Sequence, residues 1–297
     1  MPEGLRWDLE GRDWPNRAAS RFVHAGGLRW HVQVAGTGPG ILLVHGTGAA
    51  SHSWRAVLPL LERRFTVVVP DLPGHGFTEA PPAARLSMPG MADALHALLQ
   101  TLRISPVVAV GNSAGAAIAA RMSLDGQLAL AGLVSVNGAL LPLRGLPGHL
   151  FSPMARLLAA SSLVPRLFAW RAADRVVVER LVRGTGSTLD AVGIELYGRL
   201  IRNPAHAAAT LDMMAHWDLR PLERDLPRLQ PKLMLVVGTN DLTVPPAEAR
   251  RVQQLLPAAT LVPLAGAGHL AHEERPREVA DLIADLADTA EVPTTSA

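Results

Sequence analysis

The stretch VVAVGNSAGAAIAARM, residues 107–122, joins an apolar run to a run of small residues through a G-N-S-A-G turn. The apolar run predicts a buried strand over 107–111, and the small residues predict a helix over 114–125. A G-x-S-x-G pattern between a strand and a helix is typical of a tight turn that leaves the serine hydroxyl exposed. We therefore predict that Ser113 is a nucleophile at the N-terminus of a helix.

Short apolar runs alternate with helical patterns on both sides of this turn. A hairpin is predicted from 20–24 and 28–35, and Ser87 is the expected N-cap of a helix. The predicted strands are 41–46, 65–72, 107–111, 131–138, 233–238 and 260–266, and the predicted helices are 52–63, 87–103, 114–125, 246–256 and 276–288. Fully apolar strands alternating with helices indicate a mostly parallel α/β sheet covered on both faces.

About 95 residues without a strand-like run separate strand 131–138 from strand 233–238. They contain helical patterns interrupted by prolines, and a structureless loop of that length is uncommon inside a domain. We therefore expect a helical lid over 140–216, inserted into a core made of 1–139 and 217–297.

A serine nucleophile needs a general base, and the base needs an orienting group. Asp241 follows strand 233–238 and His269 follows strand 260–266, in the chain order serine, acid, histidine. Because ligands of open parallel sheets gather at the carboxyl ends of the strands, we expect Ser113, Asp241 and His269 to meet at one edge. The competing His272 is expected in the next helix.

Two backbone N–H groups are candidates for an oxyanion hole. One belongs to Ala114, at the head of the helix, and the other to Thr47, in the glycine-rich His45-Gly46-Thr47-Gly48 turn. We expect His45 and His75 to be structural. The residues H-x-x-H-E-E at 269–274 do not form a predicted metal site, because no third ligand cluster accompanies them, and we expect no cofactor.

The 297-residue chain is 48% hydrophobic and 18% charged, with a formal charge of +2 and a pI of 9.8. Since the sequence holds one lysine, one tyrosine and no cysteine, a small excess of arginine keeps the pI high without a basic cluster, and we expect no nucleic-acid partner. The absence of cysteine excludes disulfides and thiolate chemistry. The apolar stretch 126–143 is interrupted by glycines, so we predict no transmembrane segment and expect a cytoplasmic location.

These features together resemble an α/β-hydrolase over essentially the whole chain. A more specific likeness rests on LRWHVQVAGTGP, LLVHGTGAASHSW, PDLPGHGFT, GNSAGAAIAARM, MMAHWDL and GHLAHEERP, with Trp7 and the segment 14–17. They resemble the magnesium-chelatase accessory protein family of bacteriochlorophyll synthesis (the BchO type). The resemblance implies a role in tetrapyrrole synthesis at the magnesium chelatase step, and an association with magnesium chelatase. Asn112 is a departure, since GHSAG is associated with that family.

Asn112 also resembles the pattern of hydrolases that cleave C–C bonds of aromatic ring-fission products, which carry HGxGPGA, GNSFGG and GHW. Our first hypothesis is a serine hydrolase in which Ser113, Asp241 and His269 form and hydrolyse an acyl-serine. This chain differs from the C–C hydrolase pattern at Ala49, Ala116 and Leu270, so C–C bond hydrolysis is the second hypothesis. A tetrapyrrole-binding accessory protein with little hydrolytic activity is the third. Asn112 flanks the nucleophile and is directed either toward the lid-side cavity or toward the sheet behind it.

A small, largely apolar or tetrapyrrole-like substrate is expected, because the lid is rich in aromatic, methionine and leucine side chains. The candidate substrate-binding residues are Asn112, Phe151, Phe168, Trp170, Met213, Met214 and Leu270.

Overall fold

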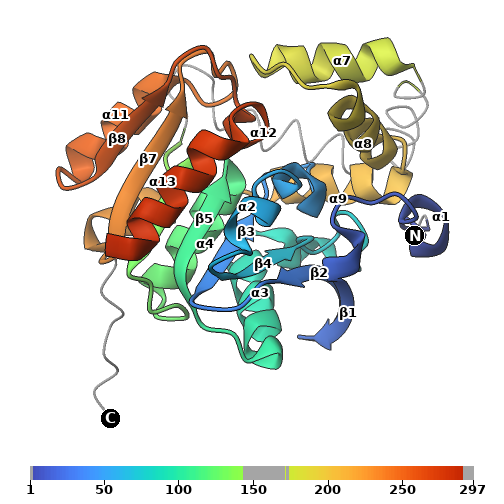
Figure 1. Cartoon of the computed structure of the whole chain (residues 1–297), viewed down its shortest axis with the longest axis horizontal. Coiled ribbons are helices and arrows are strands. Elements are labelled where there is room, and N and C mark those ends of the chain that lie inside the picture. Colours follow the sequence, from blue (N-terminus) through green and yellow to red (C-terminus); the bar gives the residue numbers. More distant parts are fainter. Residues whose placement is uncertain (1–2, 143–170, 172–173, 290–297) are drawn as a thin grey trace.

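The computed structural model describes residues 3–142, 171 and 174–289. Its centre is an eight-stranded sheet of order β1-β2-β4-β3-β5-β6-β7-β8 (Figure 1). The strands are β1 (Ser20–Ala25), β2 (Leu28–Ala35), β3 (Gly40–Val44), β4 (Thr66–Pro70), β5 (Pro106–Asn112), β6 (Gly132–Val136), β7 (Lys232–Gly238) and β8 (Thr260–Leu264). The predicted strands are thus confirmed. Strands β3 to β8 run parallel, and β2 is antiparallel to β1 and β4.

The central strands are apolar throughout because both of their faces are buried. Ile41 and Leu43 of β3 belong to one core cluster, whereas Leu42 and Val44 belong to the other. Helices α3 (Met88–Leu102), α4 (Ala114–Leu124), α10 (Arg220–Asp225) and α11 (Pro246–Leu255) cover the face of Leu42 and Val44, and α2 (Leu58–Leu61) and α13 (Pro276–Thr289) cover the face of Ile41 and Leu43. This is the α/β-hydrolase architecture that the pattern predicts.

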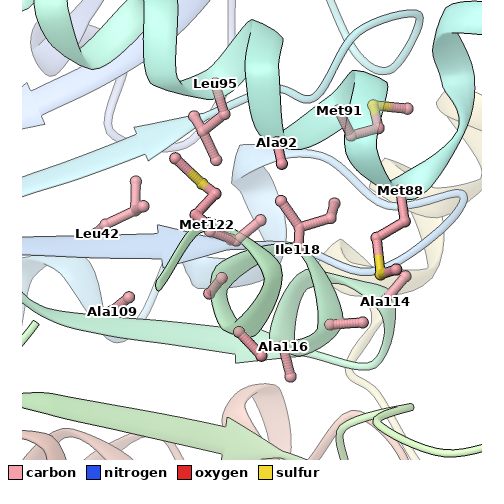
Figure 2. Packing of buried hydrophobic residues seen from close by; sticks show 14 of the residues in the cluster. Leu42, Met88, Met91, Ala92, Leu95, Ala109, Ala114, Ala116, Ile118 and Met122 are labelled. Atoms are coloured by element: carbon pink, nitrogen blue, oxygen red, sulfur yellow. The ribbon is translucent and has the colours of Figure 1, made fainter. Parts of the chain in front are cut away.

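Helix α4 is packed closely between the sheet and α3 because most of its residues are small. Figure 2 shows its side chains against α3 on one side and strands β3 and β5 on the other; the labelled contacts come from Leu42, Met88, Met91, Ala92, Leu95, Ala109, Ala114, Ala116, Ile118 and Met122. All of these side chains are buried. The expected N-cap of α3 is confirmed, since the Ser87 hydroxyl accepts a hydrogen bond from the N–H of Gly90 (3.4 Å).

The predicted helix 52–63 is wrong as one continuous element. The chain instead forms a 3₁₀ turn, η2 (Ser51–Trp54), followed by the short α2. Pro59 lies in the first turn of α2, where proline is tolerated, whereas in a continuous helix its ring would clash with the carbonyl of Arg55. That carbonyl accepts a hydrogen bond from the side-chain amide of Asn16 (3.1 Å).

The described part of the predicted lid is helical. It contains α7 (Arg175–Gly184), α8 (Ala191–Ile201) and α9 (Pro204–Ala215), which we call the cap helices. Figure 1 shows α7 and α8 together beyond one end of the sheet. Residues 143–170 and 172–173 of the predicted lid lie outside the described residues. No helix within the described ranges is long and apolar enough to cross a membrane.

His206 fastens α9 to two loops of the core. Its Nδ1 accepts a hydrogen bond from the N–H of Gly76 (3.1 Å), and its Nε2 donates to the carbonyl of Gly48 (3.2 Å). Because Nδ1 accepts the N–H of Gly76, it cannot also carry a proton, and the ring is therefore neutral. Burial lowers the pKa of His206 from 6.5 to about 4.

This environment predicts acid sensitivity. Between pH 6.5 and about 4, His206 binds a proton in the unfolded chain but not in the folded chain. The free energy of unfolding therefore falls as the pH falls through this interval. We expect His206→Gln to lose about 3 kcal/mol less than wild type over the interval, measured by urea unfolding. His24→Gln, at an exposed ring, is the control and should keep the wild-type slope. Equal slopes for wild type and His206→Gln would contradict this assignment.

Candidate active site

Ser113 occupies the tight turn between β5 and α4. Its backbone has φ 52° and ψ −119°, a conformation that L-residues rarely adopt. The two glycines of the pattern are required by close packing: a Cβ on Gly111 would lie 2.2 Å from the N of Ala116, and one on Gly115 would lie 2.3 Å from the carbonyl O of Val44. The turn thus holds the serine in a strained conformation, and its side chain is partly exposed.

The predicted oxyanion donors flank this serine. Ala114 is the first residue of α4, and the turn that contains Thr47 packs on Ser113, since a Cβ on Gly46 would lie 3.0 Å from the Cβ of Ser113. Within the described part of the chain, neither the Ala114 N–H nor the Thr47 N–H donates a hydrogen bond to a protein acceptor. Both N–H groups are therefore available to a ligand oxygen at Ser113.

Asp241 and His269 form a buried hydrogen-bonded pair. The distance from His269 Nδ1 to Asp241 Oδ2 is 2.8 Å, and the two side chains are 7% and 0% exposed. The other carboxylate oxygen of Asp241 accepts from the N–H groups of Thr243 (2.7 Å) and Val244 (2.9 Å). Because a carboxylate can only accept, the proton of this hydrogen bond lies on Nδ1 of His269.

Two asparagines tie the His269 loop to the strand ends. The amide nitrogen of Asn112 donates to the carbonyls of Val136 (3.1 Å) and His269 (3.1 Å). Asn137 donates to the carbonyls of Gly268 (2.8 Å) and His269 (3.0 Å). The carbonyl of the candidate base is therefore held by two amides, one of which is adjacent to Ser113.

Asn112 therefore takes the direction toward the sheet and the loops behind it. Asn112 is 2% exposed, and its amide nitrogen donates to two backbone carbonyls, one at the end of β6 and one in the His269 loop. Sequence reasoning did not identify Asn137, which has φ 47° and also accepts a hydrogen bond from the N–H of Gly238 (2.8 Å). Its signal was an asparagine directly after a buried strand, a position at which asparagine tolerates a left-handed backbone.

The remaining predicted substrate residues have different surroundings. Met213 is fully buried, and its sulfur accepts a hydrogen bond from the Thr47 hydroxyl (3.7 Å). Met214 is partly buried, and Leu270 is buried in a cluster with residues of α7 and α8. Phe151, Phe168 and Trp170 lie outside the described residues.

A second serine–histidine–aspartate array involves β1, β2 and the residue after β4. His31 Nε2 is 3.0 Å from the hydroxyl of Ser20, and His31 Nδ1 is 2.7 Å from Asp71 Oδ2. Ser20 begins a strand, and its own N–H donates to the carbonyl of Arg17. The indole of Trp7 lies 4.9 Å from the imidazole of His31. Ser20 therefore stands at the start of a strand, whereas Ser113 stands directly before the first residue of α4.

The other candidate histidines are structural, as the sequence indicates. His45 is buried, and its Nε2 accepts a hydrogen bond from the N–H of Leu72 (2.9 Å). His272 lies in α12 (Ala271–Glu274) and packs on the ring of Trp54, with centroids 4.2 Å apart. Burial lowers the pKa of His272 to about 3, so the ring is neutral. Among the described residues, no group of three or more His, Asp or Glu side chains could hold a metal ion.

Comparisons with known proteins identify the family of this chain. The family described as alpha/beta hydrolase fold matches residues 39–276. The magnesium-chelatase 30 kDa subunit of Rhodobacter capsulatus is 38% identical over 275 residues, which cover 92% of this chain and 96% of that protein. The 2-hydroxy-6-oxo-2,4-heptadienoate hydrolase of Pseudomonas putida is 26% identical over 91% of this chain and 97% of its own length.

Solved structures show the same fold. An α/β hydrolase fold protein from Burkholderia ambifaria superimposes with a TM-score of 0.76, at 24% identity, over 96% of this chain and 100% of that chain. This likeness supports the assignment of the fold and nothing beyond the fold.

The packing around the Ser113 turn predicts that it tolerates no side chain on its glycines. Gly115→Ala places a methyl group against the carbonyls of Val44 and His45, so we expect a loss of about 3 kcal/mol in the free energy of unfolding. Gly184→Ala is the matched control, because a Cβ there meets nothing within 4 Å. Urea unfolding of both variants checks the prediction, and a Gly115→Ala protein as stable as the control would refute it.

Proposed function

Because this chain belongs to the α/β hydrolase fold family, we propose that it is a serine hydrolase whose nucleophile is Ser113, with His269 as general base and Asp241 as orienting acid. The observation that carries the proposal is the buried Asp241–His269 hydrogen bond (2.8 Å), tied through Asn112 to the strained turn at Ser113. The substrate has a carbonyl group that the serine hydroxyl attacks.

The reaction follows from the roles of these groups. The Ser113 oxygen bonds to the substrate carbonyl carbon while its proton passes to Nε2 of His269. Asp241 keeps the imidazole in the tautomer that accepts this proton and stabilises the resulting cation. The proton then goes to the leaving group, an acyl-serine forms, and water activated by the same histidine releases the acid.

The N–H groups of Thr47 and Ala114 serve as the oxyanion hole in this proposal. They are donors beside Ser113 with no protein acceptor among the described residues, so they need no rearrangement to receive the developing negative charge. Loss of one such donor typically raises the barrier by about 2.7–4 kcal/mol.

The biological setting is proposed from the relative that is 38% identical over 96% of its length and is named as a magnesium-chelatase 30 kDa subunit. By that likeness, the enzyme acts in or supports tetrapyrrole synthesis at the magnesium chelatase step, in association with the chelatase and in the cytoplasm. The substrate is small and largely apolar, or tetrapyrrole-like. The apolar side chains of Met213 and Leu270, which lie next to Thr47 and His269, are consistent with it.

Two other activities define the outcomes of a substrate test. Cleavage of 2-hydroxy-6-oxo-2,4-heptadienoate, the compound in the name of the Pseudomonas putida relative, would support C–C bond hydrolysis. Quenching of the six tryptophans by protoporphyrin IX, with no ester hydrolysis, would support a tetrapyrrole-binding accessory role. Hydrolysis of nitrophenyl esters that requires Ser113 supports the proposed serine hydrolase.

Labelling by a fluorophosphonate tests the nucleophile. We expect wild type to gain one phosphonyl group on Ser113 and Ser113→Ala to gain none, measured by mass spectrometry of the intact protein and its peptides. Ser20→Ala is the matched control, because Ser20 also contacts a histidine that is paired with an aspartate, and it should label like wild type. Equal labelling of Ser113→Ala and wild type would rule out the mechanism.

Removal of the Asn112 amide tests its positioning role. Asn112→Leu removes one of the two side-chain amides that hold the His269 carbonyl, so we expect kcat for a nitrophenyl ester to fall by about 10- to 100-fold with little change in KM. Asn240→Leu removes a comparable amide-to-carbonyl bond from an exposed position beside Asp241, and should retain activity within a few fold. An unchanged kcat for Asn112→Leu would show that this amide does not position the base.

A further inference from the structure

The loop that follows α7 contacts both the loop of Asp241 and the loop of His269. The carbonyl of Thr185 accepts hydrogen bonds from the N–H of His269 (3.3 Å) and from the N–H of Leu242 (3.2 Å). The hydroxyl of Ser187, which is 1% exposed, accepts from the N–H of Leu270 (2.8 Å). Residues 185–187 thus bind the neighbours of the acid and the base at the same time.

Glycines allow this contact to be made backbone to backbone. Gly186 has φ +83°, and a Cβ on it would lie 1.9 Å from the carbonyl oxygen of Asn240. On the other side, a Cβ on Gly268 would lie 2.3 Å from the carbonyl carbon of Gly186. Gly186 therefore fills the space between the residue before Asp241 and the residue before His269, where no side chain fits.

The backbone of His269 is consequently held on two sides. Its carbonyl receives the amides of Asn112 and Asn137, and its N–H donates to Thr185. Loops are the more mobile parts of a fold, and both Asp241 and His269 lie on loops after separate strands. Thr185, directly after α7, therefore binds the N–H of His269, whereas the two asparagines bind its carbonyl.

Apolar and polar contacts connect the same region to the cap helices. Val178 and Val182 of α7 pack with Leu270, the residue after His269. Tyr197 of α8 donates a hydrogen bond to Glu273 in α12 (2.8 Å), and Glu273 also pairs with Arg55. Helices α7 and α8 therefore contact the segment that carries the candidate base.

We propose that Gly186 and Ser187 are positioning residues for the Asp241–His269 pair, and that the loop at 185–187 transmits the position of α7 to the base. This inference rests on the proposed serine hydrolase. Neither residue takes part in the chemical steps. Each holds the loop of Asp241 and the loop of His269 in a fixed position relative to each other.

Two variants test the loop, and each has a control. Ser187→Ala removes the acceptor of the Leu270 N–H, and Ser53→Ala is its control, because the Ser53 hydroxyl is buried with no partner among the described residues. Gly186→Ala forces the loop away from Asn240, and Gly184→Ala is its control, because a Cβ there meets nothing within 4 Å. Thermal unfolding establishes that each protein is folded.

Two measurements are made on these proteins. The first is the rate constant for labelling of Ser113 by a fluorophosphonate. The second is the NMR signal of the His269 ring, including its Nδ1 proton, assigned with His269→Gln. The NMR signal reports the Asp241–His269 pair whether or not the protein hydrolyses a substrate, and a purely structural role at a distance would not move it.

We expect labelling to slow by about 10-fold in Ser187→Ala. We expect it to slow by about 100-fold in Gly186→Ala, because a misplacement of about 1 Å in a catalytic group reduces the rate by about that factor. In both variants the His269 signal should shift or broaden. Both controls should match wild type. Folded Ser187→Ala and Gly186→Ala proteins with wild-type labelling and an unchanged His269 signal would overturn the inference. If wild type is not labelled, the proposed function fails, and the His269 signal alone decides whether the loop positions the pair.

Discussion

The close approach of α4 to the ends of β3 and β5 is the constraint on which the rest of the site depends. It leaves no room for a Cβ at Gly111 or Gly115, and it forces Ser113 into a positive φ. The strain is maintained because α4 is packed on both sides by buried apolar residues, so the turn cannot relax without opening the core. The same approach puts the first N–H groups of α4 and the Thr47 turn beside the serine hydroxyl.

Around this turn, buried side chains bind backbone polar groups at the strand ends and in the His269 loop. Asn112 and Asn137 bind carbonyls of the His269 loop, and Ser187 binds an N–H of the same loop. A buried N–H or C=O without a partner is costly, so these side chains are needed wherever loops meet below the surface. The network that satisfies the loops is also the network that fixes the direction of the candidate base.

Local patterns predicted the strands, most of the helices, the Ser113 turn and the N-cap Ser87. They failed for 52–63, where the apolar spacing is helical. There Pro59 lies in the first turn of a separate short helix, and the side chain of Asn16 donates a hydrogen bond to the carbonyl of Arg55. They left the direction of Asn112 open and missed Asn137, Gly186 and the Ser20–His31–Asp71 array. The partners of Asn112 and of the loop at 185–187 come from distant parts of the chain: Asn112 and His269 are 157 residues apart, and Ser187 and Leu270 are 83 apart.

The sequence by itself determined the alternation of buried strands and helices, the glycine-flanked turn, and the order in which serine, aspartate and histidine follow the strands. These features depend on the period of apolar residues and on backbone sterics, which act over a few residues. The tertiary structure decided that His269 is hydrogen-bonded to Asp241 while His272 packs on Trp54, and that Ser113 lies beside two N–H groups with no protein acceptor among the described residues. Hydrogen bonds of this kind depend on where separate loops meet in space, and spacing along the chain does not encode that distance.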